Sequence, residues 1–340
     1  MKIIQVGNFD RTHHFHVFYN TDYRVFLGLV RNGHMVIQFS DRDAARESNF
    51  LSSKGLGKKS LNEKLINAVK EVRPNLVVLG HADLIDNETL DSIRQLLPSI
   101  KIAQYNVDPV FNEKSMKGFR RRIRSVDSSF ITTAGEVLKK FSRNNHILSF
   151  MPNPVDLAID TARNFEKVDL EYDIGFSSSG PYRCEVMTWL IKHLPGAKFN
   201  WIGNKGSNRL YGAGYMNFLA SVKIGVNIPH LDDAKSRPYL YSSDRMAHYL
   251  GNGHLVFLDK ASCFSDCYSE NEVVFFDAKA ELLEKLRYFI EHDDERQCIA
   301  ENGYLKAHGQ YNSNLVAKYI IERTFEEKLT ECYRWPTDLW

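Results

Sequence analysis

Two successive sets of apolar strands that alternate with helices predict an α/β protein of two Rossmann-like, doubly wound domains facing a cleft. The chain has 340 residues, more than a single hydrophobic core usually organises. The alternation begins near the N-terminus and begins again near residue 168. Between the two sets, residues 151–155 contain two prolines in three positions, which impose an extended backbone and end any helix.

In the first half, apolar runs and amphipathic helices alternate as expected for a parallel sheet with helical crossovers. Residues 61–72 have a helical period, with Leu61, Leu65 and Val69 on one face, and Pro74 follows. Gly33 is a residue type that commonly ends a helix, and it follows the helix predicted at 22–32. Strands are predicted at residues 2–6, 35–39, 76–80, 100–105 and 128–132, and helices at 22–32, 61–72 and 90–97.

The second half starts with alternating apolar residues at 168–176. Strands are predicted at 168–176, 198–202, 222–228, 255–258 and 273–276, helices at 183–193, 244–250 and 278–291, and a turn at 211–214. We therefore expect an N-terminal Rossmann-like domain at 1–152, a C-terminal Rossmann-like domain at 153–315, and a helix and tail at 316–340 that would pack back across the domains.

Composition excludes several classes of protein. The chain has 44 Lys and Arg against 42 Asp and Glu, so net charge gives no reason to expect nucleic-acid binding. No stretch approaches the roughly 20 apolar residues of a membrane span, and the N-terminus is not typical of a signal peptide. The five cysteines show no disulfide spacing, which predicts a reducing, cytoplasmic setting. Cys263 and Cys267 could form a metal site together with His254, but we interpret them as free structural thiols.

The segment 241–257 is the most informative for function. Ser242, Ser243 and Asp244 are residue types that cap helix N-termini, and a helix beginning there turns unpaired N–H groups and a positive dipole end into the cleft. Such a helix end binds a diphosphate, and Arg245 in its first turn adds a fork of donors. The same residues could equally cap an ordinary α/β helix.

The order Arg245-x-x-His248-x-x-x-x-Gly253, followed by an apolar strand, resembles the Arg-x-x-Glu-x-x-x-x-Gly segment of CgeB-like and related GT-B glycosyltransferases of family 1 or 4 type. Further segments in matching order extend the resemblance over most of the chain: 31–34, 39–43, 152–156, 173–176, 223–229, 272–276, 278–291 and 296–303. The resemblance implies a GT-B fold, an acceptor bound by the N-terminal domain, a nucleotide-sugar donor held by the C-terminal domain, and no bound metal or other cofactor.

One position departs from the family pattern. The family glutamate, which in similar enzymes accepts hydrogen bonds from the donor ribose, is His248 here. A neutral imidazole accepts one hydrogen bond and lacks the charge and bidentate geometry of a carboxylate. His248 is therefore either a weaker ribose ligand or a helix residue packed on the sheet.

Two other loops of the second half are expected at the same site. Residues 176–183 run from a strand through small residues into a helix, where backbone amides can meet phosphate, and Arg183 is the second candidate diphosphate ligand. Residues 201–206 leave a strand with two glycines, a candidate loop for the base or ribose. The complete donor-binding set is Ser179, Gly180, Arg183, Gly203, Asn204, Asn227, Ser242, Ser243, Asp244, Arg245 and His248.

An inverting transferase needs a carboxylate or histidine beside the acceptor hydroxyl. Candidates in the first half follow strand ends: Asp10, His13, His14, His16 and Asp108. A retaining enzyme would instead depend on stabilisation of the leaving group by Arg183, Arg245 and the helix dipole.

Residues 114–124 carry six basic side chains, and Met116, Phe119 and Ile123 recur among them at helical spacing. This helix either docks peripherally on anionic lipid at the inner face of the membrane or packs its apolar stripe on its own sheet, and the sequence favours packing.

We predict a glycosyltransferase that moves a sugar from a nucleotide-activated donor to a glycan, lipid-linked or cell-surface polysaccharide acceptor. A non-catalytic GT-B-like binding protein and a sugar-nucleotide epimerase remain the alternatives.

Overall fold

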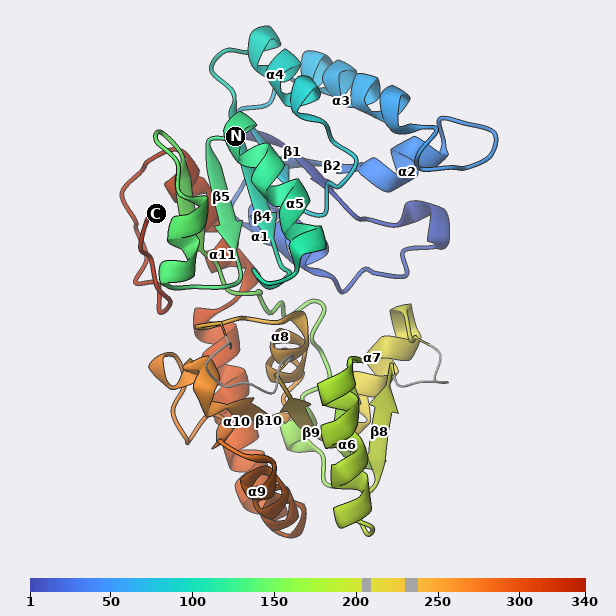
Figure 1. Ribbon diagram of the computed structural model, residues 1–340, viewed down its shortest axis with the longest axis vertical. Helices are drawn as coiled ribbons and strands as arrows, with labels where there is room; N and C mark the ends of the chain where they lie inside the picture. The colour runs from blue at the N-terminus through green and yellow to red at the C-terminus, as the bar shows by residue number, and fades with distance from the viewer. Residues whose placement is uncertain (204–208, 230–237) are drawn as a thin grey trace. The chain divides into compact units, whose positions relative to one another are not determined.

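The computed structural model describes residues 1–203, 209–229 and 238–340. It divides into two compact units, each with its own parallel sheet (Figure 1). The first unit contains Met1–Pro154 together with Asn312–Trp340, and the second contains Val155–Tyr311. The C-terminal helix and tail therefore belong to the first unit.

The first unit has a six-stranded sheet in the order β2-β1-β3-β4-β5-β6, with every pair parallel. Its strands are β1 (Lys2–Gly7), β2 (Met35–Ser40), β3 (Leu76–Leu79), β4 (Lys101–Asn106), β5 (Ser128–Ile131) and β6 (Ile147–Phe150). Its α-helices are α1 (Thr21–Arg31), α2 (Asp41–Arg46), α3 (Lys58–Val72), α4 (Asn87–Leu96), α5 (Glu113–Arg122) and α11 (Ser313–Thr324).

Apolar side chains of α3 and α4 form one core with strands β1, β3 and β4, and the two helices run side by side (Figure 1). Helix α11 packs on α1 at Gly28, where a Cβ atom would lie 2.0 Å from the Ser313 carbonyl oxygen. Only glycine permits this close approach, so the sequence of α1 is fitted to α11 although the two are far apart in the chain.

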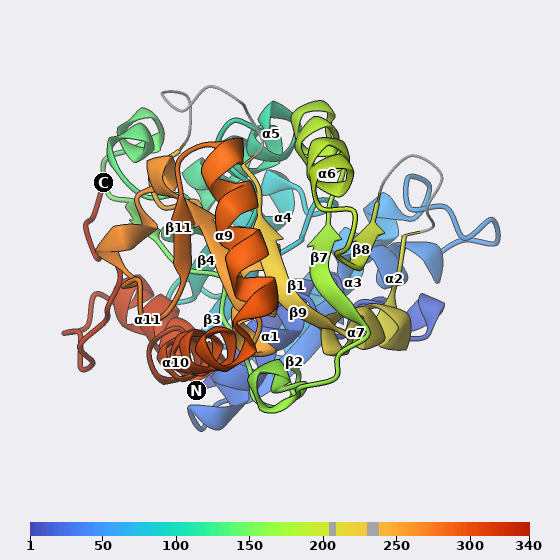
Figure 2. The ribbon, with the colours of Figure 1, turned by 90° about the horizontal axis from the view of Figure 1, so that it is seen from below.

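The second unit has a five-stranded parallel sheet in the order β11-β10-β9-β7-β8. Its strands are β7 (Tyr172–Ser177), β8 (Phe199–Ile202), β9 (Val222–Asn227), β10 (Leu255–Asp259) and β11 (Val274–Phe276). Its α-helices are α6 (Pro181–His193), α7 (Gly212–Ala220), α8 (Asp244–Gly251), α9 (Lys279–Glu291) and α10 (Asp293–Gln310). Helices α6 and α9 lie on one face of this sheet (Figure 2), and their apolar side chains belong to one core with its strands.

Short 3-10 helices complete the two units: η1 (Arg11–His13), η2 (Ile123–Ser125), η3 (Glu136–Phe141), η4 (Asn164–Glu166), η6 (Lys260–Ser262) and η7 (Phe264–Asp266). Among the helices that the structure describes, none has both the length and the apolar character needed to cross a membrane.

Two element predictions were wrong. The strand predicted at 168–176 begins only at Tyr172, because its partner β9 begins at Val222, directly opposite Tyr172, and Val168 is 62% exposed. The turn predicted at 211–214 is the start of helix α7, whose Tyr215, Phe218 and Leu219 are buried and hold the helix on the sheet.

Candidate functional site

The order of strands reverses between β7 and β9 in the second unit. From β7 the chain forms β8 on one side and then returns to form β9 on the other side of β7. Helix α6 follows β7, and α8 follows β9. In open parallel sheets, ligands bind at the carboxyl ends of the strands at such a reversal, where helix N-termini present unpaired N–H groups.

Arg245 lies in the first turn of α8 and is 8% exposed. Its Nη2 donates to Asn227 Oδ1 at 2.7 Å and to the Ile228 carbonyl oxygen at 3.0 Å, both at the end of β9. Its guanidinium also lies 4.9 Å from the ring centroid of Phe176 in β7. Arg245 therefore joins the ends of the two strands that flank the reversal.

Arg183 lies in the first turn of α6 and approaches the same place from the other helix. Its Nε donates to the Ile228 carbonyl oxygen at 3.1 Å, and its Nη1 donates to Ser178 Oγ at 2.9 Å. Because Arg183 and Arg245 share the Ile228 carbonyl as an acceptor, the structure places two guanidiniums at one point of the sheet edge.

Among the described residues, the two arginines have no negatively charged hydrogen-bond or ion-pair partner. All the hydrogen-bond acceptors given above are neutral, and neither arginine forms an ion pair with a carboxylate of the described residues. Burial lowers the pKa of Arg245, and burial followed by the charge of Arg245 lowers the pKa of Arg183. Cations at helix N-termini also oppose the helix dipole. An anion such as a diphosphate would offset these costs and satisfy the remaining donors.

The other predicted donor residues lie on elements around this point. Ser243 caps α8, accepting from the Met246 N–H at 3.3 Å and donating to Asn227 Oδ1 at 3.2 Å. Gly180 is the N-cap of α6 with φ 123°, and Gly203 follows β8 with φ 88°. Shared hydrogen bonds thus connect Arg183, Asn227, Ser243 and Arg245, whereas Ser179, Gly180, Gly203, Ser242 and Asp244 lie on the adjoining loops and helix ends. Asn204 lies outside the described residues.

In the first unit, the predicted catalytic candidates separate into two groups. Asp108 lines a cavity of about 660 Å³ at the carboxyl ends of β3 and β4. The residues lining this cavity do not include Asp10, His13, His14 or His16. Asp10 instead lies 2.8 Å from His13 Nδ1, and the His13, His14 and His16 side chains are on the exposed segment after β1. Within the described ranges, no three or more His, Cys, Asp or Glu side chains are grouped to hold a metal ion.

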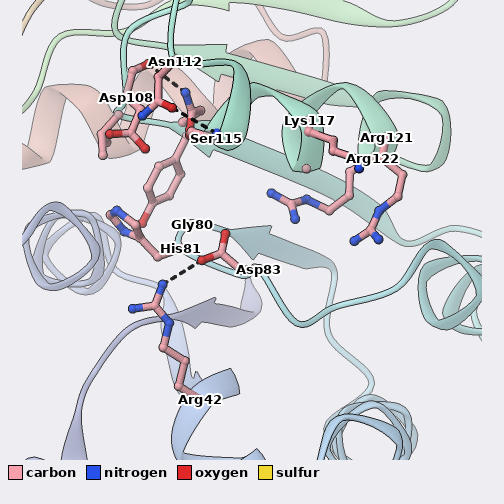
Figure 3. Close-up of a pocket in the computed structure, with 14 residues that line it drawn as sticks. Arg42, Gly80, His81, Asp83, Asp108, Asn112, Ser115, Lys117, Arg121 and Arg122 are labelled. Atoms are coloured by element: carbon pink, nitrogen blue, oxygen red, sulfur yellow. Dashed lines mark hydrogen bonds and ion pairs between the residues drawn. The ribbon is translucent and has the colours of Figure 1, made fainter. Parts of the chain in front are cut away.

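A second charged group at a strand reversal was missed from the sequence. The first sheet reverses between β1 and β3, and there the buried carboxylate of Asp22, in the first turn of α1, lies 3.0 Å from His81 Nδ1. Tyr105 donates its hydroxyl to the same carboxylate, and the Asn8 N–H donates at 2.7 Å. His81 lines the cavity (Figure 3).

These contacts decide the charge of Asp22. Burial alone would raise its pKa, but the charge and hydrogen bond of His81 and the hydrogen bond from Tyr105 hold the pKa below its ordinary value. An ionised Asp22 accepts the Nδ1 proton of His81 in both charge states, so in the neutral imidazole it is Nε2 that carries the lone pair. The arrangement is an oriented base beside a cavity.

One sequence signal pointed to this pair. Gly80 is the last residue of the predicted strand at 76–80, and His81 directly follows it. At Gly80 a Cβ atom would lie 2.1 Å from Asp22 Oδ1 and 2.3 Å from the Tyr105 hydroxyl, so the pair depends on a glycine before the histidine. The strand order that brings Asp22 to His81 was not predicted.

Comparison with known proteins agrees with this architecture. Residues 183–322 match the family described as glycosyl transferase-like. The structure is similar to Anabaena HepE, solved in complex with UDP-glucose, with a TM-score of 0.57 at 13% identity over 96% of this chain and 100% of that chain. The chain has the GT-B fold, and part of it is similar to the glycosyl transferase-like family. The fold predicted from the sequence is thus confirmed.

Other proteins whose structures are similar to this chain differ in their chemistry. AviGT4, a glycosyltransferase involved in avilamycin A biosynthesis, aligns with a TM-score of 0.58 at 12% identity, over 96% of this chain and 97% of that chain. UDP-GlcNAc 2-epimerase from Neisseria meningitidis, bound to UDP-GlcNAc, aligns with a TM-score of 0.52 at 11% identity, over 96% of this chain and all of that chain. No curated protein matches the sequence.

His248, which replaces the glutamate of similar glycosyltransferases, is 6% exposed. Its Nδ1 lies 2.9 Å from the hydroxyl of Tyr215 in α7, and the two rings meet edge to face. This contact favours the interpretation of His248 as a residue packed between α8 and α7.

The basic helix α5 buries its apolar stripe. Met116, Phe119 and Ile123 are 0%, 1% and 7% exposed and form a core with Leu138 and Leu148. The stripe is therefore not available to insert into lipid, and only basic side chains of 114–124 remain for a membrane contact.

Proposed function

We propose that the chain transfers a glycosyl group from a nucleotide-activated sugar, held in the second unit, to a hydroxyl group of an acceptor bound in the first unit. The observation that carries the proposal is the pair of guanidiniums, Arg183 and Arg245, that meet at the Ile228 carbonyl and form no ion pair with a carboxylate in the described part of the chain. A diphosphate supplies two adjacent anionic groups, which suits two forks of donors and two helix N-termini.

His81, held by Asp22, is the proposed base. It would accept the proton of the acceptor hydroxyl on Nε2 as that oxygen attacks the anomeric carbon, while Arg183 and Arg245 stabilise the charge that develops on the departing diphosphate. A base in this position suits a single displacement with inversion. The products are then a glycosylated acceptor, a nucleoside diphosphate and the proton taken up by His81.

Similar proteins support the class of donor. HepE is solved with UDP-glucose, and the Neisseria epimerase with UDP-GlcNAc, so two proteins of similar fold hold UDP-sugars. The proposal also includes a cytoplasmic role in polysaccharide biosynthesis, with a glycan or lipid-linked acceptor and electrostatic contact of α5 with an anionic membrane.

The proposal is tested by incubating the chain with UDP-, GDP-, CMP- and dTDP-sugars, with and without a panel of glycan and lipid-linked acceptors. We expect a UDP-, GDP- or dTDP-sugar to release its nucleoside diphosphate only when an acceptor is present, and to give a product with inverted anomeric configuration by NMR. Interconversion of the nucleotide sugar without acceptor would instead identify an epimerase. Nucleotide-sugar binding without any turnover would identify a non-catalytic binding protein, which is the outcome that the buried His248 would then explain.

A further inference from the structure

The cavity of the first unit is lined by more positive than negative side chains. Its cations are Arg42 from α2 and Lys117, Arg121 and Arg122 from α5, and its carboxylates are Asp83 and Asp108. Figure 3 shows Arg42 and the α5 residues on different sides of the cavity that His81 also lines. The proposed base therefore shares its cavity with a group of cations.

Arg122 is the buried member of this group, at 4% exposed. Its Nε donates to Gln104 Oε1 at 3.1 Å and its Nη1 to the Ala82 carbonyl oxygen at 3.1 Å, and both acceptors are neutral. Its Nη2 has no partner among the described residues, and no described carboxylate forms an ion pair with it. A buried guanidinium without a counter-ion is costly to maintain, and an anionic ligand in the cavity would offset that cost.

Lys117 and Arg121 add charge that the protein does not neutralise fully. They lie four residues apart on α5, where like charges repel each other. Arg121 approaches Asp86 only at 3.8 Å, and Lys117 forms no ion pair with a described carboxylate. Arg42 pairs with Asp83 at 2.7 Å, but Asp83 is 66% exposed, so an incoming anion can compete for Arg42.

The positive surface continues beyond the cavity. Lys117 and Arg121 also line a neighbouring groove with Arg120, Arg124, Lys140 and Arg143, where Glu113 is the one acidic residue among those that line it. Adjacent positive clefts raise the local concentration of anions and guide them inward. Both hollows therefore favour the same class of ligand.

We infer that the acceptor carries a phosphate monoester, which binds to Arg122, Lys117 and Arg121 while the hydroxyl to be glycosylated lies at His81. A compact dianion with three acceptor oxygens suits several donors from one helix and a guanidinium from α2. That the phosphate ligand is a glycosyl acceptor rests on the proposed function. Binding of the phosphate to this cavity does not depend on turnover and can be measured by itself. A soluble sugar phosphate and a lipid phosphate share this chemistry.

Calorimetric titration of the full chain tests the inference. The probes are glucose 6-phosphate as the soluble source, farnesyl phosphate as the lipid source, and glucose as the neutral match, all at one fixed ionic strength. We expect at least one phosphate to bind and glucose not to bind. The double variant Lys117→Gln/Arg121→Gln should weaken phosphate binding about tenfold or more, because charge-assisted hydrogen bonds are lost. The phosphate that binds more tightly identifies the source.

The control is Lys64→Gln/Lys70→Gln, which removes the same charge from exposed positions of α3. Equal weakening in this control, equal affinity for glucose and glucose 6-phosphate, or unchanged phosphate affinity in the α5 variant would overturn the inference. UDP titrated in parallel should bind the α5 variant as it binds the wild type. UDP binding with no phosphate site would leave the proposed function intact, whereas a phosphate site without nucleotide binding would refute the proposed function alone.

Discussion

The two units place side chains of opposite charge at the same topological position. In the first unit, the reversal between β1 and β3 holds the carboxylate of Asp22 in the first turn of α1, against His81 after β3. In the second unit, the reversal between β7 and β9 holds Arg183 in the first turn of α6, beside Arg245 in the first turn of α8.

The difference shows how one topology is given two roles. A carboxylate at a helix N-terminus is stabilised by the helix dipole, and Asp22 has its hydrogen bonds satisfied within the protein. Guanidiniums at helix N-termini are opposed by the dipole, and the acceptors of Arg183 and Arg245 in the described residues are neutral. The first arrangement orients the proposed base, whereas the second suits an anion from outside.

The largest effect is expected from His81→Gln, which removes the proposed base. The kcat should fall by about 10² to 10⁴, because proton acceptance from the hydroxyl is lost, while donor affinity stays unchanged. Steady-state kinetics and donor titration measure the two quantities. His34→Gln, at a histidine that does not line the cavity, is the matched control. A kcat for His81→Gln within threefold of the wild-type value would contradict the proposal that His81 is the base of the first unit.

Asp41 is a second buried carboxyl group of the first unit, but it lacks the histidine and tyrosine contacts that lower the pKa of Asp22. Burial raises the pKa of Asp41 to about 7, with Arg42 acting in the opposite direction. A carboxyl group with a raised pKa keeps its proton in the folded state, so the free energy of unfolding falls as pH rises from about 4 to about 7.

Asp41→Asn should abolish that dependence. Between pH 5 and pH 8 the variant should gain on the order of 1 to 4 kcal/mol relative to wild type. Urea unfolding at the two pH values gives the comparison, with Asp91→Asn on the exposed side of α4 as the control. Parallel pH profiles for wild type and Asp41→Asn would contradict the assignment.

The smallest effect is expected at His248, which sharpens the description of the second unit. Because the imidazole is buried against the Tyr215 hydroxyl, His248→Gln should change donor affinity by less than about threefold while lowering the free energy of unfolding by about 1 kcal/mol. Calorimetry and thermal unfolding measure these separately. A tenfold or greater loss of donor affinity would place the imidazole on the donor instead.

Periodicity predicted most of the fold, because regular spacing of apolar residues can be recognised within the short stretch of sequence that forms each strand or helix. Helix α10 was not predicted, since its buried face contains no Leu, Ile, Val or Phe that would indicate a helical period and is made instead of Arg296, Ala300, Gly303, Tyr304 and Ala307. The strand at 168–176 was predicted too long because its start depends on where β9 begins.

The candidate site divides in the same way. Arg245 and Ser243 were predicted because a helix cap is a local signal, and Arg183 because it follows a strand through small residues. Asp22 and His81 are 59 residues apart and meet only through the order β1-β3-β4, which local patterns do not specify. The loop 10–16 was chosen for its three histidines, but the described structure leaves them off the cavity lining.

The most direct test of the central claim is calorimetric titration of UDP, GDP, CMP and dTDP into the wild type, Arg245→Met and Arg287→Met, the last an exposed arginine of α9. The account predicts that a nucleotide binds the wild type and Arg287→Met equally, and binds Arg245→Met about 100-fold more weakly, because a buried charged contact is lost. Unchanged affinity in a folded Arg245→Met variant, confirmed by circular dichroism, would contradict it.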